Sequence, residues 1–191
     1  MMSLKRYLIM MFVLCGSVCA SHLLTNGDFE EPFTFTTGWL YNGTYVDYCV
    51  NRGVNYDPDP DYEVYIHTHG GFFRYLKLYQ TVDIPTTDLE FSVNAKLYAV
   101  TYCHPWSWAG AAVVVSYLDE SNSVLGETMI CYSIGPCPWT NTDTSHIIEV
   151  TDSLWYSYAF NIEDELANLS GVNQSEIARI QVALYIRMEW C

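Results

Sequence analysis

The sequence is built from short runs in which apolar and polar residues alternate, with turn-forming residues between them. The clearest run covers residues 89–99, where Leu89, Phe91, Val93, Ala95, Leu97 and Ala99 alternate with polar side chains. A period of two places successive side chains on opposite faces of a strand, so this run predicts a strand with one buried face. Similar runs at 62–68, 74–84, 155–162 and 177–187 predict further strands.

Two features between these runs refine the prediction. Residues 111–118 are apolar on both faces, which indicates a central strand, and residues 119–123 predict a turn that joins it to 124–132 as a hairpin. Asn161 precedes three acidic residues, a pattern typical of a capped helix start, and 173–176 resembles a capping box that begins one further turn. The prediction is an all-β, two-sheet antiparallel β-sandwich (jelly roll) with one or two short helices.

The first twenty residues have the pattern of a signal peptide. Lys5 and Arg6 form a charged start, 7–15 is an apolar core, and Val18-Cys19-Ala20 offers small residues for cleavage after Ala20. Residues 21–191 then form a single domain, of ordinary size for one core. The expectation is a secreted, extracellular protein with no membrane insertion after removal of the signal.

The charge of the chain restricts its partners. Without Lys5 and Arg6, 6 basic residues stand against 22 acidic ones, hence a net charge of −16. Phosphate backbones are bound by neutralising their charge with Lys and Arg, so nucleic acid is not expected as a partner.

The expected mature chain has an odd number of cysteines. Five remain, namely Cys49, Cys103, Cys131, Cys137 and Cys191, and an oxidising compartment favours their pairing. Cys131 and Cys137 flank a turn-forming stretch, which predicts a disulfide between them. Cys191 is the expected odd residue, either free or joined to a partner chain.

Several short motifs resemble one known superfamily. They are Asn26-Gly27-Asp28-Phe29-Glu30, Gly38-Trp39, Tyr79-Gln80-Thr81-Val82 and the late pattern Trp155-x-x-Tyr158-x-Phe160. In this order they resemble the galactose-binding-like β-sandwich superfamily, which includes many carbohydrate-binding modules. The resemblance implies a two-sheet jelly roll, but the fold alone does not define a ligand.

The resemblance also implies a metal. In that superfamily the carboxylate after the Phe often joins backbone carbonyls around a structural Ca²⁺, which prefers oxygen ligands. Here this carboxylate is Glu30, with Asp28 as a helper, and only Glu189 could serve as the usual acidic partner near the last strand. The other interpretation is that Asn26-Gly27 forms a plain turn and Glu30 is solvated.

Aromatic residues of two segments are the candidate ligand contacts. Tyr102, Trp106 and Trp108 lie in one predicted loop, and Trp139 follows Cys137-Pro138. Planar rings stack on the C–H faces of sugars, and loops at the end of a rigid sandwich often carry such sites. The alternative is that these tryptophans close the ends of the core.

No pattern in the sequence indicates catalysis. The many carboxylates show no spacing typical of a glycosidase pair, and the motif Gly-x-Ser-x-Gly is absent. The expected function is therefore non-catalytic carbohydrate binding. The alternative is a disulfide-stabilised extracellular structural or surface-assembly protein without a small-molecule ligand.

Overall fold

The protein has an all-β fold. The computed structural model describes residues 12–13, 23–32, 38–44, 49–54, 62–68, 73–101 and 106–189. Over these residues one large sheet runs in the order β2 (Leu40–Gly43), β5 (Phe73–Asp83), β11 (Arg179–Glu189), β7 (Trp108–Leu118), β8 (Val124–Ile134) and β9 (Ser145–Glu149). A second sheet has the order β1 (Phe12–Val13), β6 (Leu89–Ala95) and β10 (Tyr156–Asn161), and β3 (Cys49–Gly53) pairs with β4 (Glu63–His67).

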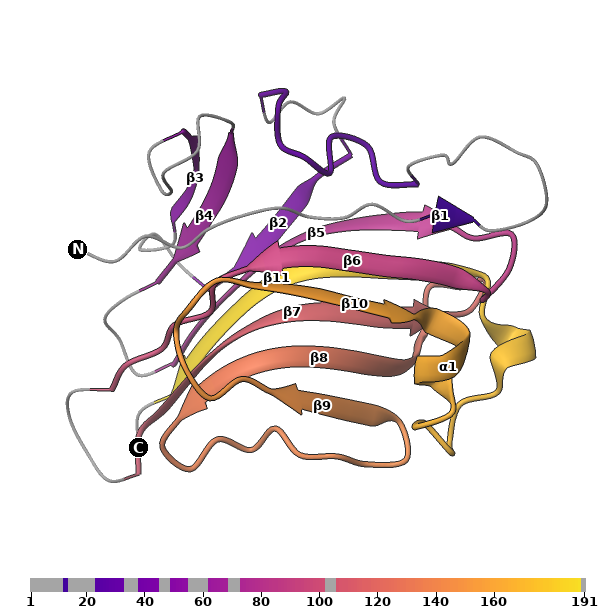
Figure 1. The fold of residues 1–191 in the computed structure, drawn as a ribbon. Coiled ribbons are helices and arrows are strands. Elements are labelled where there is room, and N and C mark those ends of the chain that lie inside the picture. The colour runs from indigo at the N-terminus through magenta and orange to yellow at the C-terminus, as the bar shows by residue number, and fades with distance from the viewer. Residues whose placement is uncertain are drawn as a thin grey trace.

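The two larger sheets are the layers of a sandwich, so the predicted fold class is confirmed. Figure 1 shows β6 and β10 lying across the front of the large sheet. The alternating runs supply the core between the layers, because the predicted inward residues of 89–99 are all buried. From the large sheet, Leu76, Leu78, Val113 and Val182 pack into the same core.

The strand β7 is central, as its sequence predicted. All its residues are buried, since β11 pairs on one side and β8 on the other. The turn before β8 forms around Asp119, whose carboxylate accepts hydrogen bonds from the N–H groups of Ser121 and Ser123. The predicted hairpin is therefore confirmed.

One edge of the large sheet differs from the prediction of purely antiparallel strands. β9 pairs with β8 in parallel, with Cys131 opposite Glu149. A parallel neighbour requires a connection that runs the length of the sheet, and residues 135–144 provide it. This connection places Trp139 next to the outer face of the large sheet, the face that points away from β6 and β10.

The short helices form where they were predicted. α1 (Ile162–Leu166) is capped by Asn161, whose side chain accepts from the N–H groups of Glu163 and Asp164. The single 3-10 turn η1 (Gln174–Glu176) is capped in the same way by Asn173. Glu165 of α1 is buried and contacts His146 of β9 and Thr128 of β8, which fastens the helix to the sheet edge.

Two residues of the predicted signal peptide belong to a strand. Phe12 and Val13 form β1, opposite Glu90 and Leu89 of β6, whereas the rest of 1–20 lies outside the described residues. Among the helices of the described part of the chain, none is long and apolar enough to cross a membrane.

Candidate functional site

On the outer face of the large sheet, three neighbouring rows of side chains near its centre define the candidate site. Strand register defines the rows, since directly opposite residues share a face. The first row is Asn42, Lys77, Tyr185, Ala112, Cys131 and Glu149; the second is Leu40, Tyr79, Ala183, Val114, Met129 and Ile147; the third is Thr81, Gln181, Ser116, Glu127 and Ser145. Small or aliphatic residues form the middle of this face, and larger aromatic residues flank them.

Three half-buried aromatic side chains gather over these small residues. Tyr79 comes from β5, Tyr185 from β11 and Trp139 from the 135–144 connection, and all three pack on the cluster of Ala112, Val114, Met129, Cys131 and Ala183. The rings of Trp139 and Tyr185 lie 5.9 Å apart between centroids and are tilted by 34°. We call Tyr79, Tyr185 and Trp139 the aromatic platform.

A glycine lets Trp139 reach this position. A Cβ added to Gly110 of β7 would lie 2.4 Å from Cζ3 of Trp139, a distance at which one of the two groups must move. The indole also meets Trp108 edge-to-face, with centroids 5.6 Å apart. The Trp139 indole therefore packs directly on the backbone at Gly110 and, on one side, against the indole of Trp108.

Polar side chains that can form hydrogen bonds border the platform. Lys77 lies 5.9 Å from the ring centroid of Tyr79, and burial lowers the pKa of its ammonium while the charge of Glu127 opposes that shift. Glu127 accepts a hydrogen bond from Ser116 at 2.7 Å, and Gln181 donates to Thr81 at 3.0 Å. Rings with a few amide, hydroxyl and charged groups beside them are the usual components of a small-molecule site.

Two thiols lie beside the platform. The structure gives Cys131, which is buried, and Cys137, which is half-buried, as free cysteines, so it does not contain the predicted disulfide between them. Burial raises the pKa of Cys131 to about 12 and also raises the pKa of Cys137. Both groups are therefore neutral thiols at ordinary pH, and neither is an activated nucleophile.

The predicted aromatic contacts end up in different environments. Trp139 is part of the platform, whereas Trp108 is the first residue of β7 and only 5% exposed, so it supports Trp139 and its ring is not presented to solvent. Trp106 is 69% exposed in the turn before β7. Tyr102 lies outside the described residues.

Sequence reasoning missed Tyr79 and Tyr185, although a signal for them was present. The alternation that places Leu76 and Leu78 inward also puts Lys77 and Tyr79 on the opposite face, and the same holds for Tyr185 between Leu184 and Ile186. The alternation does not show that β5 and β11 are adjacent strands. In the structure these two strands pair, and Lys77 lies opposite Tyr185.

The motifs of the opening segment, residues 23–32, meet in space at the edge of the large sheet. Gln80 clamps Thr25 with two hydrogen bonds, accepting from its N–H at 2.7 Å and donating to its carbonyl at 2.9 Å. The indole of Trp39 donates to the carbonyls of Thr25 and Asn26, and its ring lies 5.1 Å from that of Phe29. These residues fix the segment on the sheet.

The oxygens expected to bind calcium are engaged with N–H donors. Glu30 Oε1 accepts from the N–H of Tyr62 at 3.1 Å, and Asp28 Oδ1 accepts from the N–H of Glu30 at 3.3 Å. The backbone carbonyls of Phe29 and Glu30 accept from the guanidinium of Arg52. In the described part of the chain, no group of three or more His, Cys, Asp or Glu side chains could hold a metal ion. The carbonyl pair beside the Glu30 carboxylate is thus bonded to a cationic side chain.

Comparison with known proteins does not place the chain in a family. No protein-family model matches the sequence, and no curated protein matches it either. The resemblance to the galactose-binding-like superfamily therefore stays a prediction.

Proposed function

We propose that the protein is a secreted, non-catalytic carbohydrate-binding β-sandwich, with the aromatic platform as its ligand-binding surface. The observation that carries the proposal is the convergence of Tyr79, Tyr185 and Trp139 from three separate elements on one face, all partly exposed. Pyranose rings stack on such flat surfaces through their C–H faces, while the hydroxyl groups need polar partners at the border.

The charges of the chain favour an uncharged glycan. The protein carries a formal net charge of −14, which repels polyanionic sugars at long range. On the platform side of the sheet, Lys77 is balanced by Glu127, which lies near enough to oppose the downward shift of the lysine's pKa. Lysine and glutamate can then donate to and accept from neutral hydroxyl groups.

The test is a screen of immobilised neutral glycans, followed by titration calorimetry on the best ligand. We expect Trp139→Ala and Tyr185→Ala each to weaken binding about tenfold or more, as happens when a central aromatic contact is removed. Tyr185→Phe keeps the ring and should stay within about twofold of the wild type.

Tyr98→Ala is the matched control, because Tyr98 is 40% exposed and follows β6, away from the platform. Circular dichroism checks that each variant is folded. Equal loss in Tyr98→Ala, or glycan binding that Trp106→Ala abolishes and Tyr185→Ala does not, contradicts the platform. No glycan binding together with self-association in the ultracentrifuge would favour the surface-assembly alternative.

A further inference from the structure

The guanidinium of Arg52 contacts the opening segment beside Glu30, whose carboxylate the superfamily resemblance implies as a calcium ligand. Arg52 belongs to β3, and its Nε and Nη2 donate to the carbonyls of Phe29 and Glu30 in the opening segment. Arginine carries a permanent charge and several fixed donors, so it can satisfy adjacent carbonyls simultaneously.

Two further contacts link Arg52 to Tyr62 and Tyr62 to Glu30. Its Cζ lies 3.3 Å from the centroid of the Tyr62 ring, close enough for cation–π attraction. The backbone N–H of Tyr62 donates in turn to the Glu30 carboxylate at 3.1 Å. Glu30, Arg52 and Tyr62 are therefore mutually connected, and they join the opening segment to the β3–β4 hairpin.

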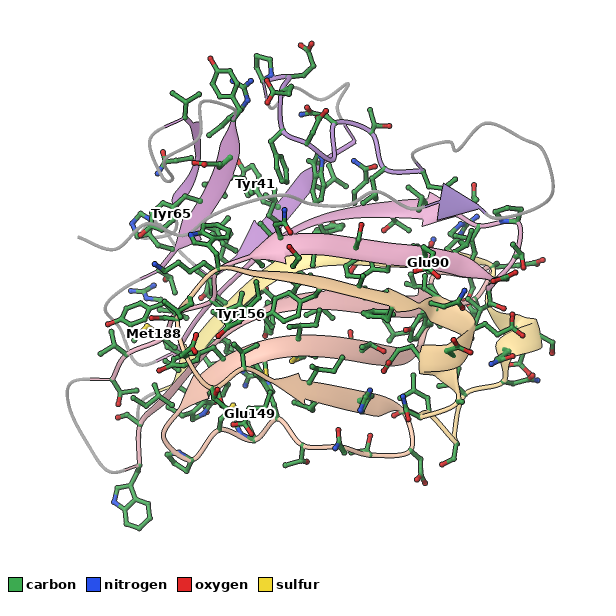
Figure 2. The ribbon with its side chains drawn as sticks, in the orientation of Figure 1. Tyr41, Tyr65, Glu90, Glu149, Tyr156 and Met188 are labelled. Carbon is green, nitrogen blue, oxygen red and sulfur yellow. The ribbon has the colours of Figure 1, made fainter. Side chains whose placement is uncertain are left out.

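The opening segment has two attachments. On one side Gln80 and Trp39 fasten it to the large sheet, and on the other Arg52 and Tyr62 fasten it to the hairpin. The hairpin itself packs on the sandwich core, because Val64 and Ile66 of β4 are buried there with Leu76 of β5. Figure 2 labels Tyr65 on this hairpin and Tyr41 on β2. The second attachment thus joins the opening segment to a hairpin that is anchored in the core.

We infer that Arg52 takes the place of the structural Ca²⁺ in this protein and makes the attachment of the opening segment independent of metal. A divalent ion cannot share the Phe29 and Glu30 carbonyls with a guanidinium, because the two cations repel each other at that distance. The carboxylate of Glu30 supports Tyr62, which covers the Arg52 charge.

Thermal unfolding of the full chain in calcium and in chelator tests the metal part of the inference. We expect the same melting temperature for the wild type in both buffers. A saturable rise in melting temperature with Ca²⁺ overturns the inference, because it shows that the ion binds the folded protein in preference to the unfolded one.

Hydrogen exchange tests the role of Arg52 itself. In Arg52→Met we expect exchange at residues 23–32 to become about tenfold faster, while strands β7 and β11 stay protected. Arg52→Lys keeps the charge but loses the forked donors. Its exchange rate at residues 23–32 should therefore lie between those of the wild type and Arg52→Met. Lys96→Met removes one positive charge elsewhere and should leave 23–32 unchanged.

The remaining outcomes are also decisive. If Arg52→Met leaves exchange at 23–32 as slow as in Lys96→Met, the guanidinium does not hold the segment and the inference is wrong. If Arg52→Met does not fold, the exchange of Arg52→Lys decides: a rate equal to that of the wild type contradicts the inference, and a faster rate confined to 23–32 supports it.

Discussion

At the scale of single residues, the side chains that organise the sandwich edge are polar and buried. Gln80 is 3% exposed, whereas the other buried residues of its strand, Leu76 and Leu78, are apolar. A buried amide costs free energy unless it is hydrogen-bonded, and both of its polar atoms bond to Thr25 across 55 positions of sequence. The Gln80 side chain therefore bonds the backbone of the opening segment to the sheet, as backbone hydrogen bonds join neighbouring strands.

Replacing this amide tests its contribution. Gln80→Leu removes both hydrogen bonds and leaves the N–H of Thr25 without this partner, whereas the carbonyl of Thr25 keeps the indole N–H of Trp39. We expect the free energy of unfolding to fall by about 1–3 kcal/mol, measured by urea denaturation. Gln181→Leu is the matched control, because Gln181 bonds to Thr81 at the exposed surface, and its effect should stay within about 0.5 kcal/mol.

At the scale of elements, the site depends on how a connection crosses a strand. The 135–144 connection lays Trp139 over β7 at Gly110, and Trp108 at the start of the same strand supports it. Because a glycine offers no side chain, the indole approaches the backbone more closely than any other residue at that position would allow.

A double-mutant cycle measures this contact. Gly110→Ala places a methyl group against the indole, so we expect a loss of stability of about 1–3 kcal/mol and weaker binding on the platform. In a Trp139→Ala background the same methyl group meets no ring, and Gly110→Ala should then cost much less. Additive effects of the two changes would contradict direct packing of the Trp139 indole on Gly110.

Alternation predicted the strands and the buried face of 89–99, because burial on one side is a local property of the sequence. It could not predict that β9 runs parallel to β8, that Trp139 reaches Gly110, or that Arg52 meets the carbonyl of Glu30. Each of these depends on which distant elements become neighbours, and neither spacing nor composition encodes that.

At the scale of the whole molecule, burial of ionisable groups defines the alkaline limit of the fold. Burial raises the pKa of Tyr158 to about 12, from an ordinary value of 10.0. It raises the pKa of Tyr117 as well, and Tyr117 shares a hydrogen bond with Thr128 in the core. The fold therefore favours the neutral phenols over the ionised ones.

The sign of the pH dependence follows from these raised pKa values. The contribution of the neutral Tyr117 and Tyr158 phenols to the free energy of unfolding is complete below pH 10, where phenols of the unfolded chain are still protonated. It is lost as the pH rises towards 12 and beyond. Urea denaturation at pH about 8, 10 and 11 should show stability falling above pH about 9, where the thiols of Cys131 and Cys137 ionise in the unfolded chain, and more steeply above pH about 10, where the phenols do. Tyr117→Phe should make that fall shallower, whereas exposed Tyr98→Phe should not; identical slopes would contradict the assignment.

The position of β11 has a consequence for how the chain acquires its fold. This strand of 11 residues, late in the sequence, pairs with β5 on one side and with β7 on the other. Until it inserts, β2 and β5 cannot join β7, β8 and β9, and two unpaired edges remain open to other chains. Folding that waits for such distant pairing is slow, and its intermediates are prone to aggregation. The strand that completes the platform with Tyr185 is thus also the one on which productive folding depends.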